Sequence, residues 1–496
     1  MTRSINIAIL AMGGEGGGVL ADWLVDLAEH HGFPAQSTSV PGVAQRTGAT
    51  IYYVEIFPET IAAQRRPVLA LMPMPGDVDL VIASELMEAG RAIQRGLVTP
   101  DRTTLVASTH RVYSMTEKTA MGDGRVDPAT FIEAGRTSAK HFVSGDFARA
   151  AEASNSVISA VLFGAVGASG ALPFPRAAFE DAIRRGGVGV EASLAAFAEG
   201  VRLASAPVPA PTVEAVSPPP AVGPRLAALA ERIRTQFPPA AGTVLTRGIL
   251  RLADYQDEAY AGEYLDRLDA IRDLAPANGD ARLLVETARG LALWMSYEDT
   301  IRVADLKTRR TRFERVAQEV RLHDDQLLSI HEFLHPRVEE IADTLPAAWG
   351  RWLLRTGWAR RWIERFTTSG RVVRTSSLRG YLLLYGVANL RRIRRGSLRY
   401  GAEQARISGW LARIRELAVS DPELALATAE CQRLVKGYGD THVRGVRNFE
   451  SVMSALPGLI GRPDGAARLR RLRDAALADE PGQRLAQELL QQARAA

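Results

Sequence analysis

The chain has 496 residues, 46% hydrophobic and 24% charged, so it can build more than one hydrophobic core. No stretch approaches the roughly 18 uninterrupted apolar residues of a membrane-spanning helix. The first apolar run breaks into glycines where a signal peptide would continue, and we therefore expect a multidomain cytoplasmic protein. The single cysteine, Cys431, excludes a cysteine-ligated iron-sulfur cluster, a Cys-rich zinc site and an internal disulfide in this chain.

The charge is distributed unevenly along the chain. The net charge is +5, but residues 1–204 carry −4, residues 205–224 carry −1 and residues 225–496 carry +10. The middle segment, SAPVPAPTVEAVSPPPAVGP, is rich in proline, which removes backbone donors and favours an extended path. We predict a semi-rigid linker over residues 205–224.

Residues 1–204 alternate short β-branched runs with helical stretches, which indicates an α/β layered domain. The predicted strands are residues 5–10, 49–57, 78–84 and 103–109, and the clearest predicted helix spans residues 19–32.

Residues 225–496 change to a period of about 3.6, with apolar stripes opposite Arg and Glu, which predicts an all-α domain. Six of the seven tryptophans fall here, and at helical spacing such rings build a core or an interface more often than a binding box. These residues are Trp294, Trp349, Trp352, Trp358, Trp362 and Trp410.

A glycine-rich turn follows the first predicted strand. Its glycines are Gly13, Gly14, Gly16, Gly17 and Gly18. Such a turn lets backbone N–H groups and a helix N-terminus approach an anionic group, usually phosphate, although glycines also allow tight strand-helix packing alone. It is neither G-x-G-x-x-G nor a P-loop, and no acidic ribose ligand stands about 20 residues on.

Together with STSVPGVAQRTGATIYYVEI at residues 37–56, this turn resembles the gamma domain of the 2-oxoacid:ferredoxin oxidoreductases. The family pattern is a turn of the type G-x-G-G-Q-G and, about 25 residues later, a small-polar, Gly, Gln-Arg, Gly-Gly segment. Pro41, Gly42, Gln45, Arg46 and Gly48 occupy the second part. Further matches are Asn155 opening an Ala-rich helix, Leu172-Pro173 and residues 187–197.

Within that family the chain is most similar to the beta subunit of the indolepyruvate (arylpyruvate) ferredoxin oxidoreductases, in a long form with a helical extension. Residues 291–313 and 434–450 carry the likeness of the extension. Three positions depart from the family pattern. Ala11 replaces the first glycine, Glu15 replaces the usual Gln, and Thr47 stands where many members have another small residue. An acidic Glu15 suits a phosphate site only if it points away or pairs, for example with Arg46.

The resemblance implies a Rossmann-like gamma domain, a Pro-rich linker and a mostly helical C-terminal domain. It implies a non-cluster subunit that assists the oxidative decarboxylation of an aromatic 2-oxoacid to an arylacetyl-CoA, with reduction of ferredoxin. Thiamine diphosphate with Mg and 4Fe-4S clusters would reside on a large alpha subunit, in an alpha2beta2 heterotetramer. The glycine turn, Gln45 and Arg46 would bind coenzyme A, and no residue of this chain would be catalytic or hold a metal.

Three other patterns offer alternatives. His331-Glu332-Phe333-Leu334-His335 matches H-E-x-x-H of zinc hydrolases, with Glu339, Glu340 and Glu364 downstream as possible third ligands. Pro336 disfavours the helix that such a site needs and favours a helix-end charge cluster with Arg337.

Gly122-Asp123-Gly124, followed by Asn155, is similar to the metal-binding motif of thiamine diphosphate enzymes, but its surroundings indicate a polar hairpin turn instead.

Residues 306–313, 351–366 and 390–401 are basic. They indicate either a solvated face or a seam that docks onto an acidic partner. The remaining alternative is a basic helical adaptor for nucleic acid or membrane. In residues 437–445, Asp440, His442 and Arg444 are expected in a glycine-flanked loop, either functional or capping helix ends.

Overall fold

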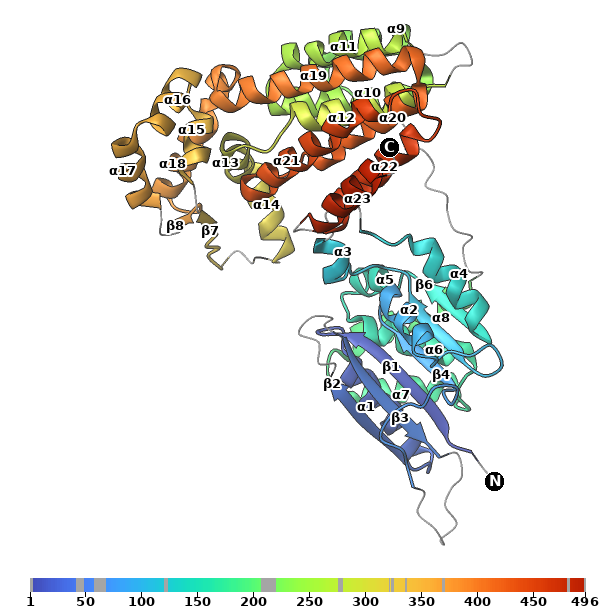
Figure 1. Cartoon of the computed structure of the whole chain (residues 1–496). Helices are drawn as coiled ribbons and strands as arrows, with labels where there is room; N and C mark the ends of the chain where they lie inside the picture. Colours follow the sequence, from blue (N-terminus) through green and yellow to red (C-terminus); the bar gives the residue numbers. More distant parts are fainter. Residues whose placement is uncertain are drawn as a thin grey trace. The chain divides into compact units, whose positions relative to one another are not determined.

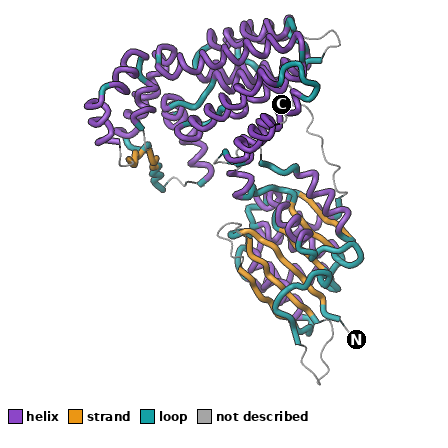
Figure 2. Tube along the Cα trace, in the orientation of Figure 1, coloured by secondary structure: helices purple, strands orange, loops and turns teal. Residues whose placement is uncertain are grey.

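The computed structural model divides into two compact units, Met1–Ala215 and Val216–Ala496, and the division falls inside the Pro-rich segment (Figure 1). The structure describes residues 3–41, 49–57, 68–119, 124–206, 220–274, 280–320, 322, 325–334, 337–367, 371–479 and 482–494. The predicted fold class is confirmed: an α/β unit is followed by a largely helical one (Figure 2).

The N-terminal unit contains a six-stranded sheet with the order β2-β3-β1-β4-β5-β6. Its strands are β1 (Ile5–Met12), β2 (Ala35–Pro41), β3 (Ala49–Ile56), β4 (Leu80–Ala83), β5 (Thr104–Ser108) and β6 (His141–Gly145). The strands β1, β4, β5 and β6 are parallel, whereas β3 runs antiparallel to both of its neighbours. The sheet is therefore mixed, and β2 and β6 are strands that the sequence reasoning did not identify.

Helices cover both faces of this sheet because successive strand residues point to opposite sides. Ile7 and Ile9 of β1 belong to one core with α1, α5, α6, α7 and α8, whereas Ala8 and Leu10 belong to a second core with α2. The helices are α1 (Gly17–His30), α2 (Leu86–Gln94), α3 (Met115–Thr119), α4 (Pro128–Ser138), α5 (Phe147–Ala153), α6 (Ile158–Ser169), α7 (Arg176–Gly186) and α8 (Val190–Ala204). The parallel strands thus direct their carboxyl ends, with the loops that follow them, to one edge of a three-layer unit.

The C-terminal unit is built from packed helices. They are α9 (Ala227–Gln236), α10 (Pro239–Tyr255), α11 (Glu258–Arg272), α12 (Arg282–Met295), α13 (Thr300–Thr308), α14 (Arg310–Glu319), α15 (Val338–Thr344), α16 (Ala347–Arg355), α17 (Gly357–Thr367), α18 (Leu378–Asn389), α19 (Leu398–Ser420), α20 (Pro422–Glu430), α21 (Gly439–Ala455), α22 (Gly465–Ala478) and α23 (Gln483–Arg494). Short 3-10 turns stand at Pro224–Leu226 (η1), Leu390–Gly396 (η2), Cys431–Leu434 (η3) and Leu456–Gly458 (η4).

The main core of this unit lies among α10, α11, α12, α19, α20, α21 and α22. Trp294 and Trp410 are buried in it with their rings 5.6 Å apart, as expected for core tryptophans. Cys431 is also fully buried here, and burial raises the pKa of its thiol to about 12. A thiol in this environment stays protonated at neutral pH.

The expectation of an all-α domain over residues 225–496 is wrong in one place. β7 (His331–Leu334) and β8 (Arg371–Arg374) form a small antiparallel sheet, with His331 opposite Arg374 and Leu334 opposite Arg371. Val373 of β8 is buried with Ala304 and Leu384, so this sheet covers a small apolar cluster beside α13 and α18.

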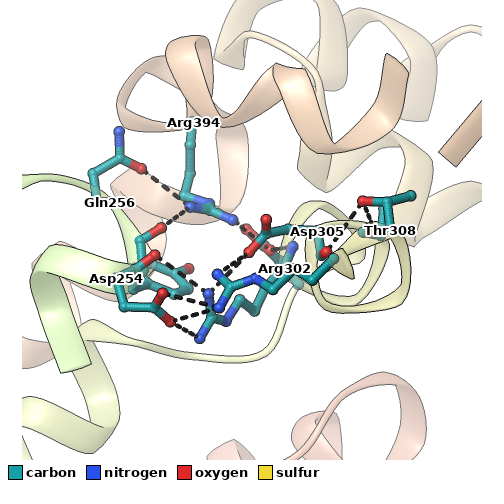
Figure 3. A network of polar contacts seen from close by, with 10 residues as sticks. Asp254, Gln256, Arg302, Asp305, Thr308 and Arg394 are labelled. Atoms are coloured by element: carbon teal, nitrogen blue, oxygen red, sulfur yellow. Dashed lines mark hydrogen bonds and ion pairs between the residues drawn. The ribbon is translucent and has the colours of Figure 1, made fainter. Parts of the chain in front are cut away.

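A buried polar network joins the end of α10 to α13 and η2 (Figure 3). The Arg394 side chain is 1% exposed and donates two hydrogen bonds to the Asp299 carboxylate, at 2.8 and 3.1 Å. It also donates to Gln256 and to the Tyr255 carbonyl, and it stacks over the Tyr255 ring. A buried guanidinium is tolerated because its donors are satisfied in this way.

Candidate functional site

The glycine turn follows β1 at the carboxyl edge of the sheet, where α/β proteins usually bind ligands. Gly14 and Gly16 have φ angles of 87° and 73°, which disfavour a side chain. Gly16 is also the N-cap of α1, and no side chain caps that helix. The first N–H groups of α1 therefore have no partner from a capping side chain.

The glycines differ in what surrounds them. A Cβ on Gly17 would lie 2.6 Å from Ala11 Cβ and 2.6 Å from Tyr52 Cε2, whereas one on Gly18 would meet Tyr52 at 3.6 Å, an ordinary contact. Gly17 is therefore required by packing of α1 against β3, which favours the packing explanation at that position. Gly14 has open space around it, so only its backbone conformation requires glycine.

Glu15 points into the sheet edge. Its carboxylate accepts hydrogen bonds from the Met12 N–H at 3.1 Å and from the Ser84 hydroxyl, and Oε1 lies 3.5 Å from His110 Nε2. Burial alone would raise the Glu15 pKa, but the interactions with His110, Ser84 and Met12 lower it below its usual value. The Glu15 carboxylate at this unusual position is thus partnered within the fold.

Ser84 and His110 were missed by the sequence reasoning. Ser84 comes directly after β4. His110 lies two residues after Ser108, the last residue of β5, and its Nδ1 is 2.9 Å from the Ser108 Oγ. The available signal was a small polar residue after each buried strand, in VIAS and in VASTH. Parallel strands bring those residues to the same edge of the sheet.

A second helix N-terminus reaches the glycine turn. Ser159 stands in the first turn of α6, and its hydroxyl would lie 2.7 Å from a Cβ on Gly16. Ser159 is 1% exposed and its hydroxyl has no hydrogen-bond partner among the described residues. No side chain caps α6 either. Two helix N-termini and an unpartnered hydroxyl therefore meet at Gly16, an arrangement that favours an oxyanion.

The remaining predicted site residues do not add to this described arrangement at the glycine turn. Gln45 and Arg46, with Gly42, Thr47 and Gly48, lie outside the described residues, so their binding role stays a prediction. Asn155 does not open a helix as expected. It lies in the turn between α5 and α6 with φ of 49°, the one positive value at a described non-glycine residue.

The H-E-x-x-H segment does not form a zinc-site helix. His331 to Leu334 form β7, so His331 is exposed while the neighbouring Glu332 points to the buried side. Glu332 forms ion pairs with Lys307 and Arg312. The alternative of a helix-end charge cluster fails for His331 to Leu334, which form a strand, whereas Arg337 does stand at a helix end, as the N-cap of α15. His335 lies outside the described residues, and the described part of the chain holds no group of three His, Cys, Asp or Glu that could bind a metal.

The polar hairpin turn predicted on Asp123 and Gly124 lies partly outside the described residues and stays a prediction. Residues 115–119 form the short helix α3, and Glu117 accepts hydrogen bonds from the Ser114 and Val126 N–H groups and from Arg111. Burial would raise the Glu117 pKa, but these hydrogen bonds lower it to about 2. Gly122 and Asp123 lie outside the described residues, so the thiamine motif gains no support.

Residues 437–445 are not a loop, because α21 begins at Gly439 and carries Asp440, His442 and Arg444. Asp440 pairs with Arg337 at the start of α15. His442 Nε2 lies 2.7 Å from Oε1 of Glu403, a fully buried residue of α19 that also accepts from Trp294 Nε1 at 2.9 Å. These contacts hold helices together, which agrees with a structural role for the segment.

Two family models match the chain. Residues 6–203 match "Pyruvate ferredoxin/flavodoxin oxidoreductase", and residues 241–455 match a family of unknown function, DUF6537. The N-terminal unit is therefore the part of the chain that is similar to this oxidoreductase family. The helical unit contains a region to which no function is attached.

Three solved structures are similar to the chain at 16% identity each. Pyruvate oxidoreductase subunit PORC from Thermotoga maritima covers 40% of this chain and 97% of its own, with a TM-score of 0.29. The gamma subunit of keto/oxoacid ferredoxin oxidoreductase from Geobacter sulfurreducens PCA covers 40% and 98%, with a TM-score of 0.28. The 2-oxoglutarate:ferredoxin oxidoreductase from Magnetococcus marinus covers 42% and 32%, with a TM-score of 0.30. No curated protein matches the chain.

Among the described helices, none is by itself long and apolar enough to cross a membrane, and one bent pair, α5 with α6, passes that test on length and composition.

Proposed function

We propose that this chain is the non-cluster beta subunit of an indolepyruvate or arylpyruvate:ferredoxin oxidoreductase, working in the cytoplasm. The observation that carries the proposal is the match of residues 6–203 to the oxidoreductase family, on a unit whose glycine turn and two helix N-termini meet at one sheet edge. The likeness of residues 291–313 and 434–450 to the long beta subunit supports the aromatic branch.

In the proposed enzyme, an alpha subunit carries thiamine diphosphate, Mg and the 4Fe-4S clusters, and the chains assemble as an alpha2beta2 heterotetramer. The partner decarboxylates the 2-oxoacid and passes two electrons to ferredoxin. This chain binds a phosphate group of coenzyme A at the N-termini of α1 and α6, with the Ser159 hydroxyl as a further donor. Gln45 and Arg46 are proposed to contact the same ligand.

Co-expression with the alpha subunit tests the proposal. The co-purified complex is assayed anaerobically for viologen reduction with indolepyruvate, phenylpyruvate, pyruvate and 2-oxoglutarate. We expect reduction that needs both chains and coenzyme A, with the aromatic acids preferred. Activity with 2-oxoglutarate or pyruvate alone would keep the family and reject the aromatic assignment. Two chains that neither associate nor act together would reject the subunit assignment.

Arg46 and Ser159 offer a finer test of the coenzyme A site. Arg46→Ala and Ser159→Ala should each raise the KM for coenzyme A more than the KM for the oxoacid, because each removes a donor to the phosphate. Ser205→Ala, at the C-terminal end of α8, is the matched control for Ser159 and should leave both constants unchanged. Equal changes for both substrates, or none, would remove these residues from the binding role.

A further inference from the structure

The hairpin formed by α16 and α17, residues 347–367, exposes four of the seven tryptophans of the chain. Trp349, Trp352, Trp358 and Trp362 are 67%, 49%, 65% and 64% exposed. Indole rings usually seek burial, and exposed apolar groups gathered on one element mark an interaction surface. The other three tryptophans of the chain are buried.

The α16–α17 hairpin is held firmly on its inner side. Leu353 and Ala359 belong to a small core with Val338 and Ala342 of α15. Gly350 lies so close to α15 that a Cβ there would be 2.4 Å from the Ala342 carbonyl oxygen. The tryptophans are therefore displayed by helices that are already fixed in place, which lowers the entropy lost on binding a partner.

The four exposed indoles lie on two helices that contact each other. Trp349 and Trp352 are three residues apart on α16, and Trp358 and Trp362 are four residues apart on α17, so each pair shares a helix face. The Trp352 and Trp358 rings bridge the two helices edge to face, with centroids 5.9 Å apart and planes at 79°. The surface is thus shaped before any partner arrives.

Arginines are interspersed with these rings. Three times a Trp is followed by an Arg three residues later, at Trp352 and Arg355, Trp358 and Arg361, and Trp362 and Arg365. Residues at this spacing lie side by side on a helix. Four arginines of the hairpin are exposed and form no ion pair with a described residue: Arg351, Arg355, Arg361 and Arg365. The hairpin contains one acidic residue, Glu364.

We propose that the α16–α17 hairpin docks onto an acidic surface of the alpha subunit, an inference that rests on the proposed function. Unpaired guanidinium groups select an anionic partner. A protein fits better than a membrane, because Leu353 and Ala359 on the apolar side of the two helices already pack against α15 and are not free to enter a bilayer. Trp and Arg together are typical of the residues that dominate binding energy in protein interfaces.

Two double variants of the full-length chain test this inference. W358Q/W362Q removes two indoles, and R361E/R365E reverses two charges, while R310E/R315E on α14 makes the same change in charge outside the hairpin. The dissociation constant for the purified alpha subunit is measured by biolayer interferometry at 50, 150 and 300 mM salt. Thermal unfolding of each variant shows whether the fold is retained.

We expect both hairpin variants to weaken assembly about tenfold or more, the loss that truncation of an interface hot spot produces. R361E/R365E should also flatten the salt dependence, and R310E/R315E should bind like the unaltered chain. At saturating alpha subunit, kcat should be the same for all variants, because the hairpin docks and does not contact substrate.

Several results overturn the inference. If the unaltered chain binds and the hairpin variants bind equally well, the docking site is wrong while the proposed function stands. If the unaltered chain does not bind the alpha subunit, both fail. Two further measurements identify a different occupant and reject ours: cosedimentation with phosphatidylserine vesicles that only the hairpin variants lose, and concentration-dependent self-association that they alone abolish.

Discussion

His442 Nε2 lies 2.7 Å from Glu403 Oε1, and this contact ties α21 to α19 around a carboxylate that is fully buried. The opposite oxygen of Glu403 accepts from the Trp294 indole of α12, so three helices meet at one side chain. Burial would raise the Glu403 pKa, but the interactions with His442, Trp294 and Arg399 lower it to about 2. The carboxylate therefore stays charged in the folded protein far below the pH at which an unfolded Glu takes up a proton.

A lowered pKa in the folded state contributes stability that is present above the unfolded pKa, near 4.5, and is lost as the pH falls toward about 2. Glu403→Gln should lower the free energy of unfolding of the helical unit by roughly 3 kcal/mol at pH 7, because it leaves the largely buried Arg399 guanidinium without its carboxylate. The difference from the unaltered chain should shrink between pH 4.5 and 2, as followed by urea unfolding. Glu450→Gln, at a largely exposed carboxylate near Arg406, is the control and should change stability by less than about 1 kcal/mol.

Gly17 and Gly18 are neighbours that should respond differently to alanine. Gly17→Ala should cost about 1 to 3 kcal/mol, since its new methyl group meets Ala11 and Tyr52 at 2.6 Å. Gly18→Ala should be neutral or stabilising by up to about 1 kcal/mol, because alanine favours a helix and has room there. Thermal unfolding of the two variants checks this difference, and equal losses would contradict the proposed contact with Tyr52.

Gly16 and Ser159 should be energetically coupled. Gly16→Ala places a Cβ at φ of 73° and 2.7 Å from the Ser159 hydroxyl, so we expect a loss of about 1 to 3 kcal/mol. Adding Ser159→Ala removes the hydroxyl and should recover about 0.5 kcal/mol or more. A double-mutant cycle from chemical unfolding measures the coupling. Strictly additive losses would mean that α1 and α6 do not approach each other at this point.

Arg394 and Asp299 form a buried ion pair. Asp299→Asn should destabilise the helical unit by about 3 to 5 kcal/mol, because the Arg394 guanidinium stays buried without a countercharge. Asp440→Asn breaks an exposed pair with Arg337 that solvent screens, so it should lower the free energy of unfolding much less than Asp299→Asn does. Urea unfolding at pH 7 compares the two variants. Similar losses would show that burial does not determine how much an ion pair contributes to the free energy of unfolding.

Much of the fold was predictable because it follows from periodicity. The buried runs at residues 5–10 and 103–109 became β1 and β5, and the change to helical spacing after the linker became the helical unit. β7 was not predictable in this way. A four-residue strand has too few residues to show alternation, and its stability depends on pairing with β8, about forty residues away.

The candidate site was only partly predictable for a similar reason. The glycine turn is visible because positive φ angles restrict the residue type, so Gly14 and Gly16 stand out in the sequence. Ser159 and His110 lie more than 90 residues from that turn and join it only through the order of the strands and helices. The sequence around a single serine or histidine gives no signal that the residue will lie at such a position.

Cys431 has a practical consequence for labelling. The chain has one native thiol, which is fully buried with a raised pKa, so maleimide reagents should leave it unmodified in the folded protein. A cysteine placed at an exposed position of the α16–α17 hairpin, such as Arg361→Cys, would then take a fluorophore at a single position without removal of the native residue. When the helical unit unfolds, Cys431 itself becomes reactive, so the same chemistry reports on docking under native conditions and on unfolding under denaturing ones.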